Sequence, residues 1–289
     1  MAVYRGYDQA GLDAQYNLRA RWPEHVGFLE AWRREGTAIR LGPGWHLDLA
    51  YGPTAAERLD LLVPESADDR RAPVLVFIHG GYWQAQDKMD VDWLGPAFAN
   101  HGVAFAGLNY ALAPTVTLDE IVRQCRSAIA WLWRNAAAFG CDPARITVAG
   151  HSAGGHLATM LAATDWTRQG GLPPTIVRGA FGLSGVYDVE PLRLSYHQKV
   201  LRIDARAVAR NSPIALKPNP AVATVVSVGG NETDEFHRQQ ADFVTAWGRA
   251  GSAVRVVRAP GLHHFDIVAR CADFAHPVGK ALLKLAAAG

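Results

Sequence analysis

The stretch Val148-Ala149-Gly150-His151-Ser152-Ala153-Gly154-Gly155-His156 contains the pattern Gly-x-Ser-x-Gly at residues 150–154. A β-branched apolar run precedes it, and a run typical of a helix follows it. A sharp turn between a strand and a helix lifts a serine hydroxyl clear of the sheet, where it can act as a nucleophile. Such a turn tolerates only small flanking residues, and Gly150 and Gly154 meet that demand. The pattern therefore predicts a nucleophilic Ser152, with a plain glycine-rich turn as the alternative.

A second motif follows an earlier apolar run. Residues 74–78 (Val-Leu-Val-Phe-Ile) have the pattern of a strand buried on both faces, and they lead into His79-Gly80-Gly81-Tyr82-Trp83. Acyl transfer builds negative charge on a carbonyl oxygen, which backbone N–H groups can stabilise when glycines let the chain approach closely. The expected donors of this oxyanion hole are the N–H groups of Gly81, Tyr82 and Ala153, with Gly80 as a substitute. We expect His79 to organise the loop.

Two loops near the C-terminus carry candidates for the base and the acid that activate a serine. The strand-like run at residues 253–257 is followed by His263-His264, and one of these is the expected base. The preceding strand-like run, at residues 223–230, is followed by Asn231-Glu232-Thr233-Asp234-Glu235. Glu232 is closest to the strand end and is the predicted acid, with Asp234 as the alternative. Asp188 is a further candidate, although its loop comes one strand too early.

Strand patterns and helix patterns alternate along most of the chain, which predicts an α/β fold with a mostly parallel sheet flanked by helices. Strands are expected at residues 46–51, 58–63, 74–78, 103–109, 146–149, 180–184, 224–228 and 254–257. The clearest helix covers residues 118–139, and a helical stretch at residues 12–36 is expected to break at Pro23. Residues 188–220 lack a strand pattern and contain several prolines, so we expect a small lid there, within a single domain of residues 1–289.

Bulk properties exclude several function classes. The 289 residues carry a net charge of only +2, which argues against a nucleic-acid or anionic-membrane partner. The three cysteines have no C-x-x-C spacing, and the histidine pairs do not match H-E-x-x-H, so we expect no metal and no cofactor. No run approaches about 18 apolar residues, and the N-terminus lacks an apolar signal segment, so cytoplasmic localisation is the expectation. A homo-oligomer is allowed.

Together these motifs resemble the α/β-hydrolase superfamily, and within it the arylformamidase (kynurenine formamidase) branch, which is related to hormone-sensitive-lipase-like esterases. That branch carries H-G-G-x-W where many esterases carry H-G-G-G, and residues 79–83 match it. Further similar segments are residues 12–19, 109–114, 150–158, 232–239 and 264–265. The resemblance implies the α/β-hydrolase fold with a cap, and it favours His264 over His263 as the base. Animal and fungal members usually place an aspartate where this chain has Glu232, and a glutamate can do the same work with a longer arm.

The resemblance implies a cofactor-independent serine hydrolase with a Ser152–His264–Glu232 triad. Its expected substrate is a small molecule: an N-formyl aryl amine, or another small-acyl amide or ester with an aromatic leaving group. Aromatic side chains near the motifs could stack on such a group. Those expected to bind substrate are Trp83, Tyr110, Tyr187 and Phe265, and Leu192, Leu194 and Tyr196 could join them from the lid. A broad-range carboxylesterase is the alternative activity, and a non-catalytic small-ligand-binding protein is the alternative of another class.

Overall fold

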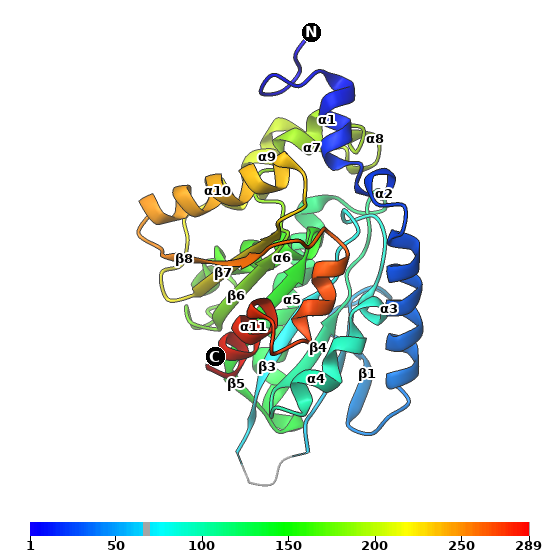
Figure 1. Cartoon of the computed structure of the whole chain (residues 1–289). Coiled ribbons are helices and arrows are strands. Elements are labelled where there is room, and N and C mark those ends of the chain that lie inside the picture. The colour runs from blue at the N-terminus through cyan, green and yellow to red at the C-terminus, as the bar shows by residue number, and fades with distance from the viewer. Residues whose placement is uncertain (66–69, 289) are drawn as a thin grey trace.

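The computed structural model describes residues 1–65 and 70–288. An eight-stranded sheet with the order β1-β2-β4-β3-β5-β6-β7-β8 forms its centre (Figure 1). The strands are β1 (Trp45–Ala50), β2 (Arg58–Leu62), β3 (Ala72–Ile78), β4 (Ala104–Leu108), β5 (Cys141–His151), β6 (Val177–Leu183), β7 (Ala223–Gly229) and β8 (Val254–Ala259). β2 runs antiparallel to both of its neighbours, β1 and β4. All the other neighbouring strands are parallel to each other. The predicted fold class is confirmed.

The predicted strands all overlap the observed ones, and those buried on both faces read as continuous apolar runs. β3 and β4 are buried almost throughout. β5 begins earlier than its apolar run does, at Cys141, which pairs with Ala72 before a register shift. Residues 142–145 (Asp-Pro-Ala-Arg) are not buried and form no apolar run, so hydrophobicity alone could not place that early part of the strand.

Helices cover both faces of the sheet, α5 (Leu118–Asn135) and α6 (Ala153–Ala162) on one and α4 (Gly95–Ala99) and α11 (Pro277–Ala288) on the other (Figure 1). α10 (Asp234–Arg249) packs on β7 and β8. The helix predicted at residues 118–139 is present as α5 followed by the 3-10 turn η3 (Ala136–Phe139). It ends where Gly140 takes a left-handed conformation, as is common after a helix. Other 3-10 turns are η1 (Lys88–Asp90), η2 (Asp92–Leu94), η4 (Trp166–Arg168) and η6 (Asp266–Cys271).

The N-terminal segment forms three helices, α1 (Gln9–Tyr16), α2 (Leu18–Arg21) and α3 (His25–Ile39), along one side of the molecule (Figure 1). The expected break at Pro23 is present, and a second break lies at Asn17, whose side chain accepts a hydrogen bond from the N–H of Ala20. That cap starts α2. Tyr16 ties α1 to α10, because its hydroxyl donates to Glu235 at 2.8 Å and accepts from Gln239 at 2.8 Å.

The segment predicted to be a lid, residues 188–220, contains the short helices α7 (Glu190–Leu194), α8 (Gln198–Leu201) and α9 (Ala205–Asn211), and the 3-10 turn η5 (Pro213–Ala215). α7 and α8 lie beside α1 (Figure 1). The N–H of Tyr196 donates to Asp13 at 2.8 Å, and the side chain of Gln9 donates to the carbonyl of Leu194 at 3.1 Å. Whether this segment works as a lid stays a prediction. Within the described residues, no helix is both long and apolar enough to cross a membrane.

Two glycines of α3 give a matched test of its packing. A Cβ on Gly36 would lie 1.9 Å from the carbonyl oxygen of Met89, whereas a Cβ on Gly27 would have no neighbour within 4 Å. Gly36→Ala should therefore destabilise the protein by about 1–3 kcal/mol, because backbone must move to admit the methyl group. Gly27→Ala should stabilise it by up to about 1 kcal/mol through helix propensity. Chemical denaturation measures both, and equal stabilisation by the two alanines would contradict the α3–Met89 contact.

Candidate active site

Ser152 occupies the turn between β5 and α6. Its backbone lies at φ 56° and ψ −117°, a conformation that L-residues rarely adopt. Its N–H donates to the carbonyl of Leu183 at 2.9 Å. The flanking glycines are required by crowding, because a Cβ on Gly150 would lie 2.3 Å from the carbonyl oxygen of Gly154, and a Cβ on Gly154 would lie 1.9 Å from that of Ile78. The expected strained turn is therefore present, with Ser152 at its tip.

Glu232 and His264 form a buried pair at the carboxyl ends of β7 and β8. Nδ1 of His264 lies 2.7 Å from Oε2 of Glu232. The other carboxylate oxygen accepts hydrogen bonds from the hydroxyl of Ser184 at 2.5 Å and from the N–H of Gly229 at 2.8 Å. Glu232 is only 5% exposed and His264 only 3%. These three donors compensate the carboxylate for its lost hydration, and the Nδ1 contact leaves Nε2 of His264 as the nitrogen available to a further partner.

The alternative base faces another part of the molecule. His263 stacks on Trp22 with ring centroids 5.3 Å apart, and its Nε2 lies 3.5 Å from a carboxylate oxygen of Asp266. The geometry therefore favours His264, which pairs with Glu232, as the base.

The alternative acids also have other environments. Asp234 is exposed at the first residue of α10, where a carboxylate suits the positive helix end. Asp188 caps the backbone N–H of Glu190 at 3.0 Å and accepts from the hydroxyl of Tyr4 at 3.2 Å. Only Glu232 of the three contacts a histidine in the described structure, so the geometry favours it as the acid.

The loop after β3 is held in an unusual backbone conformation. Gly81, Tyr82 and Trp83 all have positive φ angles, and a Cβ on Gly81 would lie 2.3 Å from the carbonyl oxygen of Ala85. His79 is buried and stacks on Tyr110 with ring centroids 4.2 Å apart. Burial lowers the pKa of His79 to about 4, so it is neutral. Its Nδ1 lies 3.0 Å from the carbonyl oxygen of Gly80, which agrees with its expected role as an organiser of the loop.

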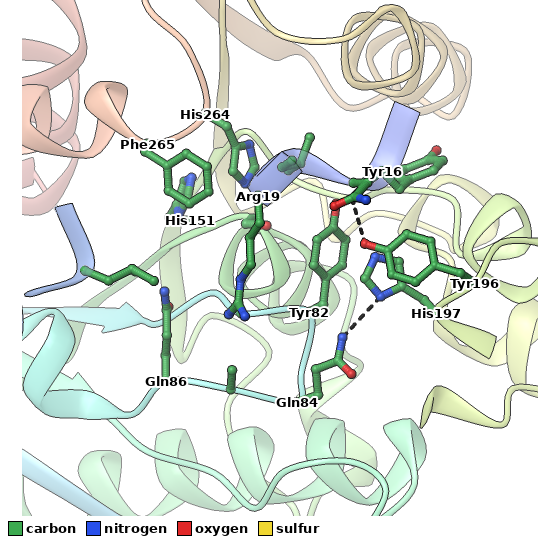
Figure 2. Close-up of a pocket in the computed structure, with 16 residues that line it drawn as sticks. Tyr16, Arg19, Tyr82, Gln84, Gln86, His151, Tyr196, His197, His264 and Phe265 are labelled. Atoms are coloured by element: carbon green, nitrogen blue, oxygen red, sulfur yellow. Dashed lines mark hydrogen bonds between the residues drawn. The ribbon is translucent and has the colours of Figure 1, made fainter. Parts of the chain in front are cut away.

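A pocket of about 400 Å³ opens where these segments meet (Figure 2). The residues that line it are Tyr16, Asn17, Leu18, Arg19, Leu29, Gly81, Tyr82, Gln84, Ala85, Gln86, His151, Ser152, Tyr196, His197, His264 and Phe265. It thus brings together the predicted nucleophile, the predicted base and two of the three expected oxyanion donors. The third, Ala153, is the first residue of α6 and is buried directly after Ser152.

Of the aromatic residues expected to bind substrate, Phe265 lines the pocket and three do not. Trp83 is buried with its ring edge-on to His156 at 4.9 Å. The Tyr110 hydroxyl donates to the carbonyls of His79 and Gly80, so this residue supports the loop from behind. Tyr187 stacks on Phe243 at 4.3 Å in the core. The expectation was wrong for these three because nearness in sequence does not give the direction of a side chain.

The lining contributed by the lid and by the N-terminal helices differs from the expected one. Tyr196 was expected from the lid and lines the pocket, whereas Leu192 and Leu194 do not. Tyr16, Arg19 and His197 were missed, because they come from α1, α2 and the segment before α8, far in sequence from the motifs. The resemblance of residues 12–19 to the arylformamidase branch was the one hint in the sequence that this segment approaches the site.

The pocket holds uncharged histidines beside the predicted base. The ring of His151 lies 4.5 Å from that of His264, and burial, followed by the repulsion from His264, lowers its pKa well below the usual range. Burial also lowers the pKa of His197 to about 4. Neither His151 nor His197 therefore carries a positive charge at neutral pH. Among the described residues, no group of three or more His, Cys, Asp or Glu side chains could hold a metal ion.

Comparisons with known proteins give a consistent result. The BD-FAE family model matches residues 59–180. Kynurenine formamidase of Danio rerio is 28% identical over 99% of both chains, and that of Salmo salar is 30% identical over 83% of this chain and 81% of its own. A solved structure from Silicibacter sp., assigned as a thioesterase, is 29% identical with a TM-score of 0.81, and the match covers 95% of this chain and 98% of the other.

Fluorophosphonate labelling tests the arrangement, because only an activated serine reacts quickly with such a probe. We expect labelling at Ser152 in the unmodified protein and none in Ser152→Ala. Glu232→Gln should slow labelling by about 10⁴-fold, as loss of the charged partner of a catalytic histidine does elsewhere. Asp234→Asn is the matched control and should label at the normal rate. A slow Asp234→Asn variant with a normal Glu232→Gln variant would reverse the assignment of the acid.

Proposed function

Because the chain belongs to the kynurenine formamidase branch of the α/β-hydrolase superfamily, we propose that it hydrolyses small-acyl amides of aromatic amines, formamides foremost, through Ser152, His264 and Glu232. The protein is a hydrolase of arylformamidase-like or carboxylesterase kind, and its substrate is a small molecule. The observation that carries the proposal is the 2.7 Å contact between His264 and Glu232 at a pocket that Ser152 also lines.

In the proposed reaction His264 first accepts a proton and then returns it. Nε2 of His264 accepts the Ser152 proton as the serine oxygen attacks the substrate carbonyl carbon, and Glu232 stabilises the imidazolium through Nδ1–H. The backbone N–H groups of Gly81, Tyr82 and Ala153 stabilise the oxyanion. The C–N bond then breaks, and His264 returns its proton to the departing aromatic amine. Water activated by His264 releases the acyl group from Ser152 as the free acid.

The pocket suits an aromatic leaving group. Its volume of about 400 Å³ lies in the ordinary range for a small ligand. Phe265, Tyr82 and Tyr196 present aromatic side chains to it (Figure 2), and such rings offer stacking surfaces to a substrate ring. Ser152 is only 2% exposed, which favours a small acyl group at the reacting carbon. We further propose that the chain acts as one domain whose residues 188–220 form the lid that carries Tyr196.

The decisive measurement is kcat/KM for N-formylkynurenine beside p-nitrophenyl acetate, with Ser152→Ala as the blank. We expect a strong preference for the formamide and a loss of about 10⁴-fold or more in Ser152→Ala, since removing a nucleophile leaves only residual catalysis. A folded Ser152→Ala variant with normal turnover would refute the mechanism. Strong ester turnover with little formamide cleavage would instead identify a carboxylesterase that uses the same site.

A further inference from the structure

Arg19 brings a positive charge to the pocket without a partner in the protein. It belongs to α2, is exposed at the pocket and points into it beside Tyr82 (Figure 2). Within the described residues, its guanidinium makes no hydrogen bond and no ion pair, whereas Arg21 of the same helix lies over the Trp22 ring at 5.3 Å. Arg19 also lines a shallower groove along α3 that continues outward from the pocket. It therefore stands between the interior of the pocket and the solvent.

The lining of the pocket contains no carboxylate that could neutralise Arg19. Burial raises the pKa of Tyr16 and Tyr82 well above the usual range, so these phenols stay uncharged. The nearby carboxylate of Asp13 is already bound by the N–H of Tyr196 at 2.8 Å and by the side chain of Gln9 at 3.0 Å. Glu232 is held by its own three donors.

The outer groove contains two carboxylates, Glu30 and Asp90, and in the described part of the chain neither forms an ion pair with Arg19. Arg33, which lines that groove, donates to Asp90 at 2.7 Å and to Asp87 at 3.0 Å, so its charge is matched. Arg34 lies 3.6 Å from Glu35. Arg19 is thus the guanidinium in this region that keeps its hydrogen-bonding capacity for a ligand.

We propose that Arg19 binds a carboxylate on the leaving group of the substrate and thereby selects acidic aromatic amides over neutral ones. The inference rests on the proposed function, because it takes the reacting carbonyl to lie at Ser152. With the acyl group at the buried serine, the leaving group extends toward the mouth, where Arg19 is exposed. A guanidinium matches a carboxylate with two parallel N–H···O contacts, and a lysine cannot reproduce that geometry.

The test compares formanilide with 2-, 3- and 4-formamidobenzoate, which differ from it only by a carboxylate at each ring position. At least one acidic isomer should have a kcat/KM higher than that of formanilide by about 10- to 100-fold, the value of a charge-assisted hydrogen bond. Arg19→Gln should remove this preference, mainly through KM, by lowering kcat/KM for the acidic isomers far more than for formanilide. Arg19→Lys should keep part of it. Arg206→Gln, which removes the same charge from exposed α9 away from the pocket, should keep all of it.

Two outcomes would overturn the inference. Equal kcat/KM for all four substrates in the unmodified enzyme would show that no anion is recognised. An equal loss for formanilide and the acidic isomers in Arg19→Gln would show a structural role for Arg19.

A binding measurement separates this inference from the proposed function. Calorimetry with 2-, 3- and 4-aminobenzoate and with aniline, on Ser152→Ala and on Ser152→Ala/Arg19→Gln, requires no turnover. Tighter binding of an aminobenzoate that depends on Arg19 supports the anion site even if no formanilide is hydrolysed, in which case the proposed reaction fails alone. Binding of all four compounds with the same affinity in both variants refutes the anion site whatever the reaction is.

Discussion

The close approach of two backbone segments without side chains between them is the constraint on which the site depends. The end of β3 and the start of α6 come so near that a Cβ on Gly154 would overlap the carbonyl oxygen of Ile78. This contact sets the turn at Ser152 directly beside the loop that carries Gly81 and Tyr82. The proposed nucleophile and the proposed oxyanion donors are thereby placed by the main chain, which reorganises less than side chains do during a reaction.

The parallel sheet supplies the second part of the arrangement. β5, β6, β7 and β8 are consecutive neighbours, so their carboxyl ends lie along one edge. Ser152 follows β5, Ser184 follows β6, Glu232 follows β7 and His264 follows β8. Ser184 donates to Glu232, and Glu232 contacts His264, so each loop along the edge supports the next. A buried carboxylate needs this support, because an uncompensated buried charge is strongly destabilising.

The sequence predicted the parts of the protein that rest on local patterns. Buried parallel strands read as apolar runs, and glycines mark the turn at Ser152, so the fold class and the loops of the site were predictable. Glu232 was preferred over Asp234 from its position at the strand end and from the resemblance of residues 232–239, and the geometry favours the same choice. The directions of Trp83 and Tyr187 were not predictable, since a residue next to a motif can face the core as easily as the ligand. Arg19 was missed because its place depends on contacts between distant segments.

The pocket therefore has two walls of different origin. The proposed reacting groups directly follow strands of the sheet or lie in the loops after them, at its carboxyl edge. The opposite wall consists of α1, α2 and the segment around Tyr196. The N–H of Tyr196 donates to Asp13 of α1, and its hydroxyl donates to the carbonyl of Tyr16 at 3.3 Å. These contacts lie outside the sheet, although Tyr16 also packs on Phe236, whose ring contacts that of His264. In such a division the proposed reacting groups and the residues that would recognise a leaving group come from different elements of one fold, so the recognised leaving group is not fixed by the fold.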